Sequence, residues 1–190
     1  MESIYTIILI NVLIFFGVRY INPEIISILA LSPADIWHQP WTAVTSMFTH
    51  YDFTHILFNM WAFYFFGSTI LRILGIGRFW IIYMTGGIVG SITYILIGDT
   101  NSWVIGASGA VFALGGALAL LRPQMKVVFF PIPVSVPLWV GVLCNFTIIT
   151  ILAIVLNLNV AWQAHLGGLV FGAAMGWFYR RRSFNSYRWN

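Results

Sequence analysis

A serine and a histidine that could act together as a nucleophile and its base lie in two separate apolar stretches. Ser108 stands near the start of "GASGAVFALGGALAL" (106–120), and His165 stands in "AHLGGLVFG" (164–172). A serine hydroxyl becomes an effective nucleophile when a neighbouring base removes its proton, and histidine is the commonest such base. The pair therefore indicates attack on a carbonyl group, provided that the fold brings the two side chains together.

A second pair of polar residues has the spacing of one helix face. His55 and Asn59 are four apart in "HILFN", so a helix would present both on the same side. Their N–H groups could stabilise the oxyanion that forms when Ser108 attacks a carbonyl, together with the backbone N–H of Ser108 at its helix start. Taken singly, each of these residues could equally be a structural hydrogen-bonding group.

The acidic residues do not suggest a third member of a triad. Asp52 and Asp99 lie at the ends of apolar runs, nearer the surface. We therefore predict a Ser–His dyad whose imidazole is oriented by packing, including the ring of Phe112 one turn after Ser108. A zinc site is not indicated, since His50 and His55 are five apart, on different helix faces, with no glutamate nearby. We predict no cofactor and no metal.

The composition is that of a membrane protein. Of the 190 residues, 60% are hydrophobic and only 7% are charged, whereas about a quarter of a soluble domain is charged. The mean hydropathy is +0.90. The net charge of +4 is better explained by membrane topology than by nucleic-acid binding. One cysteine, Cys144, cannot form an intramolecular disulfide.

The apolar runs predict an all-α membrane protein with six transmembrane helices. A helix needs about 20 apolar residues to cross the hydrocarbon core. The proline-interrupted stretch 19–52 is interpreted as a long first loop of short helices lying in the membrane interface. Nothing in 1–190 suggests a second domain. The six predicted spans are Ile4–Val18, Phe53–Leu71, Phe79–Ile97, Ala107–Leu121, Val134–Leu156 and Val160–Tyr179.

The basic residues predict the orientation. With six spans, only Arg19 falls on one side, which predicts cytoplasmic N and C termini by the positive-inside rule. The short fourth run is about 22 Å long, so Ser108 should lie below the outer surface of a core about 30 Å thick. His55, Asn59 and His165 should lie about 5–10 Å deep from that side. The eight cations on the cytoplasmic side are Arg72, Arg78, Arg122, Lys126, Arg180, Arg181, Arg182 and Arg188.

Glycines predict that the two helices that carry Ser108 and His165 pack closely. Gly168, Gly172 and Gly176 follow His165 at small-xxx-small spacing, which lets two backbones approach. Gly106 and Gly109 flank Ser108 with equally small side chains. Such close packing would bring Ser108 within reach of His165.

These motifs together resemble the rhomboid intramembrane serine proteases, most closely the compact six-helix bacterial form, the GlpG type. The motifs are "GASG", "HILFN" (55–59) and "AHLGGLVFG", in this order. The resemblance covers essentially the whole chain. It implies Ser108 as nucleophile, His165 as general base, and an oxyanion site made by the Ser108 N–H with His55 and Asn59.

The resemblance also implies what the protein acts on and where. The expected substrates are transmembrane segments of other membrane proteins, cut at small residues and entering from the bilayer near the fifth helix. The expected location is a bacterial inner (plasma) membrane, with the site opening to the periplasmic or extracytoplasmic side. The sequence departs from the family pattern at Thr42, Leu71 and Phe112, where arginine, glutamate and tyrosine are usual.

Other protein classes fit less well. A transporter would more typically show inverted repeats and paired broken helices, which we do not find. An aspartyl protease would need two membrane aspartates, and "IGD" (97–99) supplies one. A non-catalytic chaperone or scaffold with the same fold is the main alternative, although it would not need Ser108 and His165 together.

Overall fold

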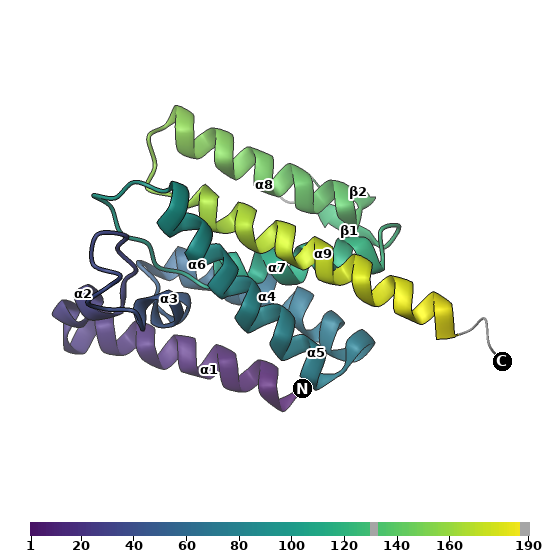
Figure 1. Cartoon of the computed structure of the whole chain (residues 1–190), viewed down its shortest axis with the longest axis horizontal. Helices are drawn as coiled ribbons and strands as arrows, with labels where there is room; N and C mark the ends of the chain where they lie inside the picture. Colours follow the sequence, from purple (N-terminus) through teal and green to yellow (C-terminus); the bar gives the residue numbers. More distant parts are fainter. Residues whose placement is uncertain (130–132, 187–190) are drawn as a thin grey trace.

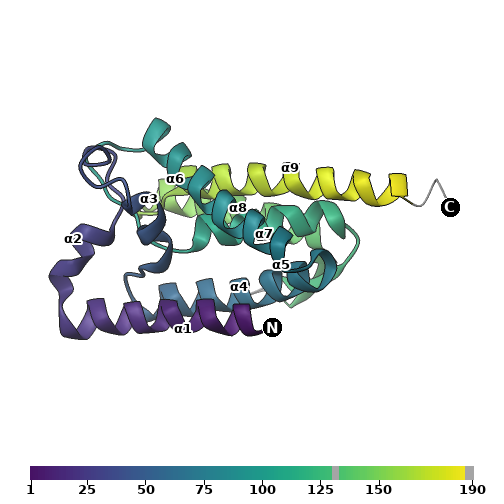
Figure 2. The ribbon, with the colours of Figure 1, turned by 60° about the horizontal axis from the view of Figure 1, so that its bottom comes forward.

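The computed structural model describes residues 1–129 and 133–186, which form a helical bundle. Figures 1 and 2 show that the long helices run side by side, with the short helices α2 and α3 at one end. The start of α1, the helix α5 and the last turns of α9 lie towards the other end. The bundle therefore has a loop-rich end and an end at which the described chain begins and stops.

The elements follow the apolar runs of the sequence. A π-helical turn (Gly17–Ile21) extends α1, and another (Ile81–Thr85) joins α5 to α6. Short 3₁₀ turns (Pro23–Ile25 and Ser46–Phe48) lie beside α2 and α3. The helices and strands are α1 (Glu2–Phe16), α2 (Ile26–Leu29), α3 (Thr42–Thr45), α4 (Phe53–Leu74), α5 (Ile76–Trp80), α6 (Gly86–Ile97), α7 (Ser108–Leu121), β1 (Lys126–Phe129), β2 (Val134–Pro137), α8 (Leu138–Val155) and α9 (Trp162–Ser186).

Within residues 1–129 and 133–186, four helical stretches are long and apolar enough to cross a membrane. They are Glu2–Ile21, Phe53–Leu74, Ile76–Ile97 and Leu138–Val155. At 14 residues, α7 is shorter than these, and α9 is not one of the four. A helix lies in each of the six predicted runs, while the crossing of the bilayer by α7 and α9 stays a prediction.

The predicted fifth span, Val134–Leu156, begins before the first residue of the helix α8. Residues Val134–Pro137 are not helical but form β2, which pairs antiparallel with β1, so that Lys126 faces Pro137 and Phe129 faces Val134. Valine and phenylalanine favour strands. A proline also keeps the residue before it out of the helical region, so α8 begins only after Pro137. The prediction of an all-α fold is therefore wrong at this small sheet.

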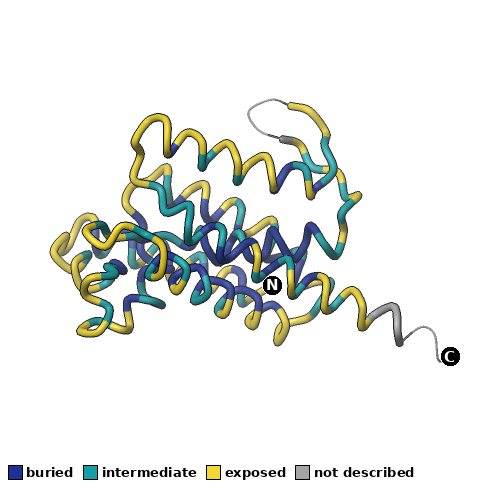
Figure 3. Tube along the Cα trace, turned by 45° about the horizontal axis from the view of Figure 1, so that its top comes forward, coloured by how far each residue is buried: buried dark blue, intermediate teal, exposed yellow. Residues whose placement is uncertain are grey.

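The helix α7 lies in the middle of the bundle. Ten of its 14 residues are buried, and it contacts α4, α6, α8 and α9. Figure 3 shows buried residues concentrated in the interior, whereas α8 is largely exposed along its length. Small side chains such as Ala113 and Ala117, both fully buried, make α7 thin enough to be surrounded. The residue that begins α7 is therefore held from several sides.

Hydrogen bonds hold the first loop together and attach it to the rest of the chain. The Trp41 indole Nε1 donates to the Ile28 carbonyl (2.9 Å), and the buried Thr42 hydroxyl donates to the Gln39 carbonyl (2.6 Å). Leu31 and Val104 exchange two backbone hydrogen bonds of 3.0 and 2.8 Å. The short side chain of Thr42 therefore contributes a local bond where the family pattern has arginine. The first loop is also connected directly to the segment that precedes Ser108.

Candidate active site

Ser108 is the first residue of α7, and a glycine makes the turn that places it there. Gly106 has φ +126°, a backbone conformation that L side chains rarely adopt. Its N–H donates to the Ser46 carbonyl at 2.8 Å. A Cβ atom on Gly106 would also lie 2.8 Å from Nε2 of His55. Both the backbone conformation and the crowding explain why glycine stands two residues before Ser108.

The structure brings Ser108 and His165 into contact. The Ser108 hydroxyl oxygen lies 2.7 Å from Nε2 of His165, which is buried in the first turns of α9. The Phe112 ring packs on the imidazole, with ring centroids 4.7 Å apart and planes at 33°. Among the described residues, Nδ1 of His165 has no hydrogen-bond partner. The imidazole is thus oriented by its bond to Ser108 and by packing, without a carboxylate.

Glycines on α9 produce this closeness. A Cβ on Gly168 would lie 2.9 Å from the carbonyl carbon of Gly109, and a Cβ on Gly172 would lie 2.6 Å from that of Ala113. Real Cβ atoms essentially never approach other atoms so closely. The glycine face of α9 therefore lies directly against the backbone of α7. The side chains of Ser108 and His165 can meet only because these two backbones are this near.

His55 borders the same site from α4. The Tyr51 N–H donates to His55 Nδ1 (3.4 Å), which leaves the ring hydrogen on Nε2. Both this Nε2 and the Ser108 hydroxyl lie close to Gly106, at 2.8 and 3.7 Å from the position of a Cβ there. A donor N–H of His55 thus faces the neighbourhood of the Ser108 oxygen.

Asn59 lies one turn further along α4 and is buried. Its Nδ2 donates to the His55 carbonyl at 2.9 Å, and no hydrogen bond joins it to Ser108 or His165 among the described side chains. Its amide has a second N–H, which could donate a hydrogen bond to a group bound beside Ser108. Of the four polar residues predicted to converge, Ser108 and His165 are in direct contact. His55 lies beside Gly106, close to Ser108, and Asn59 is hydrogen-bonded to the His55 carbonyl.

His50 is a part of the site that sequence reasoning misses. Its side chain is 2% exposed, its Nε2 accepts a hydrogen bond from the Ala107 N–H (3.4 Å), and its ring lies 5.0 Å from that of His55. Burial lowers the pKa of His50 to about 3, with His55 as a smaller cause. His50 precedes α4 instead of lying on a helix face, so helical spacing does not reveal this contact.

A small cavity adjoins Ser108. Its volume is about 20 Å³, roughly that of one water molecule. The lining combines serines, glycines and alanines with three larger apolar side chains, those of Met47, Val104 and Ile105. A side chain that enters this space beside Ser108 must therefore be small.

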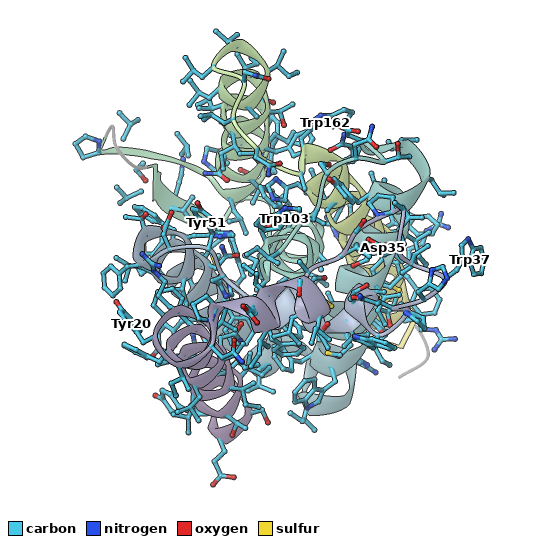
Figure 4. The ribbon with its side chains drawn as sticks, turned by 90° about the vertical axis from the view of Figure 1, so that its left-hand side faces the viewer. Tyr20, Asp35, Trp37, Tyr51, Trp103 and Trp162 are labelled. Carbon is cyan, nitrogen blue, oxygen red and sulfur yellow. The ribbon has the colours of Figure 1, made fainter. Side chains whose placement is uncertain are left out.

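The loop-rich end of the bundle lies around this site. Figure 4 shows Tyr51 and Trp103 next to each other at that end, and their ring centroids are 6.5 Å apart. Trp37 points away from the body of the molecule and is 91% exposed. Within the described residues, no three His, Cys, Asp or Glu side chains are grouped so that they could hold a metal ion.

Comparison with known proteins places the chain in one family. A family model of the rhomboid domain matches residues 37–182. The chain is 30% identical over 144 residues to rhomboid protein 1, mitochondrial, of Saccharomyces cerevisiae, which covers 71% of this chain and 40% of that protein. It is 31% identical over 140 residues to the putative rhomboid protease YdcA of Bacillus subtilis, covering 70% of this chain and 63% of YdcA.

A third relative extends the comparison. The chain is 31% identical over 147 residues to the rhomboid protease GluP of Bacillus subtilis, covering 72% of this chain but only 26% of GluP. The matched region thus spans less than two thirds of each of these three relatives. The match to the family model, residues 37–182, includes Ser108, His165, His55 and Asn59. This chain is therefore an integral, multi-pass membrane protein that belongs to the rhomboid family.

Proposed function

We propose that this protein is an intramembrane serine endopeptidase that cleaves transmembrane segments of other membrane proteins. The single observation that carries the proposal is the 2.7 Å contact between the Ser108 hydroxyl and His165 Nε2. A neutral imidazole at this distance can accept the hydroxyl proton as the serine attacks. We further propose that the whole chain, 1–190, is one protease domain.

The proposed reaction has two half-reactions, and His165 accepts and then returns one proton in each. Ser108 Oγ attacks the scissile carbonyl carbon, and its proton moves to His165 Nε2. The C–N bond breaks as His165 returns that proton to the leaving amine. Water then attacks the acyl-enzyme, giving its proton to His165, and the new carboxyl group leaves as the serine regains its hydrogen.

Three donors would stabilise the oxyanion in both halves. They are the backbone N–H of Ser108 at the helix start, the Nε2–H of His55 and the free amide hydrogen of Asn59. The orientation of His55 by Tyr51 supports this role, since it leaves a hydrogen on the nitrogen nearest Gly106. Preorganised donors of this kind are usually the largest single contribution to catalysis of acyl transfer.

The surroundings of Ser108 suggest which substrates fit. The cavity of about 20 Å³ beside Ser108 favours a small side chain next to the cut. Entry of a transmembrane segment beside α8 is supported by the small part of that helix that is buried, mainly Leu138, Gly141, Val142 and Ala153. We propose a bacterial inner (plasma) membrane location, with the site opening to the periplasmic or extracytoplasmic side.

A covalent probe tests this function. The purified full-length protein is incubated in detergent with a fluorophosphonate, and the labelled residue is mapped by mass spectrometry. Ser108→Ala should abolish labelling and cleavage of a model transmembrane substrate, with thermal stability nearly unchanged. The matched control Ser68→Ala, which removes a buried serine from α4, should keep both.

The same experiment separates the enzyme from a non-catalytic rhomboid-fold chaperone or scaffold. His165→Ala should also abolish cleavage, and the double variant should be no worse than either single one, because members of a catalytic unit do not contribute additively. A protein that is not labelled at Ser108, and that keeps its function in Ser108→Ala, would be the scaffold instead.

A further inference from the structure

The end of the bundle opposite the candidate site carries a cluster of arginines with few acids near it. Arg78 lies in α5, Arg122 directly follows α7, and the other three lie in α9; all five are exposed. None of the five acids of the chain follows Asp99, and Glu2, at the start of α1, is the acid that lies towards this end. We call this group the arginine cluster: Arg78, Arg122, Arg180, Arg181 and Arg182.

Aromatic rings pack against three of these guanidinium groups, and two of the three contacts lie within α9. The Arg181 guanidinium lies 4.4 Å from the centre of the Trp177 ring, four residues earlier on α9. Arg182 lies 4.5 Å from the Phe178 ring in the same way. Such stacking uses the face of the guanidinium group and leaves its N–H edges free for other partners.

The other two contacts join α9 to its neighbours. Arg78 of α5 lies 5.2 Å from the ring of Tyr179. Arg180 Nη1 donates to the Leu120 carbonyl in the last turn of α7 (3.2 Å). Arg122 follows two residues after Leu120. The cluster therefore spans the place where α5, α7 and α9 come together.

The chemistry of this surface fits the phosphate of a lipid. Arginine N–H groups form paired hydrogen bonds with phosphate oxygens. The rings beneath Arg181 and Arg182 are themselves exposed, Trp177 at 51% and Phe178 at 39%. Tryptophan side chains such as Trp177 are enriched at the headgroup level of a membrane, next to acyl chains. Charge and exposed apolar surface thus occur side by side, as an anionic lipid requires.

We propose that the arginine cluster binds the headgroup of an anionic phospholipid at the α5–α7–α9 junction. The lipid phosphate contacts the free edges of Arg78, Arg181 and Arg182, and its acyl chains lie along the exposed rings of α9. Because Arg180 attaches α9 to α7, the bound lipid steadies the helix pair that carries Ser108 and His165. The proposal concerns binding and does not depend on the proposed protease activity.

Lipid titration of the full-length protein in nonionic detergent tests this site. Phosphatidylglycerol and phosphatidylcholine are added separately, bound lipid is counted by native mass spectrometry, and Tm is followed. Phosphatidylglycerol should bind and raise Tm, since a ligand of the folded state stabilises it. Phosphatidylcholine should do neither, and glycerol 1-phosphate, which has the charge without acyl chains, should not raise Tm.

Substitutions in the arginine cluster test where phosphatidylglycerol binds. Arg78→Gln combined with Arg181→Gln and Arg182→Gln should weaken phosphatidylglycerol binding roughly a hundredfold, because each arginine near an anionic membrane contributes about fivefold. Trp177→Leu, which keeps an apolar side chain but removes the ring beneath Arg181, should weaken binding less. Arg19→Gln, at the other end of α1, is the control and should bind as the parent does.

Three results would overturn the proposal. One is equal binding of the two lipids by the parent protein. Another is parental binding of phosphatidylglycerol by the triple variant. The third is a rise in Tm with glycerol 1-phosphate that matches the rise with phosphatidylglycerol, which would indicate a site for free phosphate. Size-exclusion chromatography and Tm in phosphatidylcholine show whether the variants are folded, and Trp177→Leu supplies the test if the triple variant is not.

Discussion

The side chains around Ser108 are held by packing and by single hydrogen bonds. His165 has the Ser108 hydroxyl on one nitrogen and the Phe112 ring against its face. Phenylalanine replaces the tyrosine usual in the family at this position, but the ring contact with the imidazole remains. The His165 imidazole is already fixed by these contacts before it accepts the serine proton. A carboxylate is therefore not required to orient it.

The role of the α4 residues can be measured by removing one donor at a time. His55→Ala and Asn59→Ala should each lower kcat for a model transmembrane substrate by about 10- to 1,000-fold, by analogy with the loss of one oxyanion donor. Folding should persist, since each side chain makes one local hydrogen bond, and such a bond contributes only about 1 kcal/mol. Parental rates in both variants would show that these residues have only a structural role.

His50 should make stability depend on pH. Burial lowers its pKa in the folded protein to about 3, whereas an unfolded histidine has a pKa of about 6.5. Between these two pKa values the unfolded chain binds a proton that the folded protein does not. The contribution of His50 to the free energy of unfolding is therefore fully present above about pH 6.5 and is lost as the pH falls towards about 3. His50→Gln can still accept the hydrogen bond from the Ala107 N–H. Between pH 7 and pH 5, the Tm of this variant should fall less than the Tm of the parent. Equal losses would mean that other groups cause the acid sensitivity.

The pair α7 and α9 is the structural unit on which the site depends. Gly168 and Gly172 of α9 lie against the backbone of Gly109 and Ala113, and Gly176 continues the contact against Ala117. The spacing of these glycines predicts that the helices carrying Ser108 and His165 pack closely, and α9 lies against α7 in this way in the structure. Even one added methyl group would force these two helices apart.

Adding that methyl group tests the contact. Gly172→Ala should lower the free energy of unfolding by about 1–3 kcal/mol, as overpacking of a dense interior does, and should reduce activity because Ser108 and His165 separate. Gly77→Ala, in α5, is the matched control, since a Cβ there meets nothing within 4 Å. Its stability should equal or slightly exceed that of the parent. Equal Tm values for the two variants would contradict the close contact.

The distribution of charge over the whole molecule predicts its orientation in the membrane. Arg78 of α5 and three arginines near the end of α9 lie towards one end of the bundle, and the loop-rich end near Ser108 lies opposite. The positive-inside rule therefore predicts that a site at the loop-rich end faces away from the cytoplasm.

Reporter fusions can determine this orientation. A reporter after Arg78 should be cytoplasmic, and so should one after Arg188, which lies outside the described residues. A reporter inserted within 98–102 should be on the outer side, because it follows one more crossing. A cytoplasmic signal from 98–102 would overturn both the count of six spans and the predicted depth of Ser108.

Much of the architecture can be predicted from the sequence because it depends on local properties of the chain. Long apolar runs and few charges predict membrane helices wherever they occur, and "GASG", "HILFN" and "AHLGGLVFG" identify the family that the comparisons show. Ser108, His165, His55 and Asn59 can be selected because polar groups in apolar helices are rare. These inferences need only residue type and spacing.

Other features depended on contacts between distant segments. His50 comes within reach of Ala107 across 57 residues, and the Ser108–His165 contact spans the same separation. The left-handed Gly106 likewise depends on a distant segment, since its N–H donates to the Ser46 carbonyl. Such distances depend on how far apart the helices lie, and that separation is set by many side-chain contacts at once. A local sequence pattern does not contain this information, so these distances are known only from the folded structure.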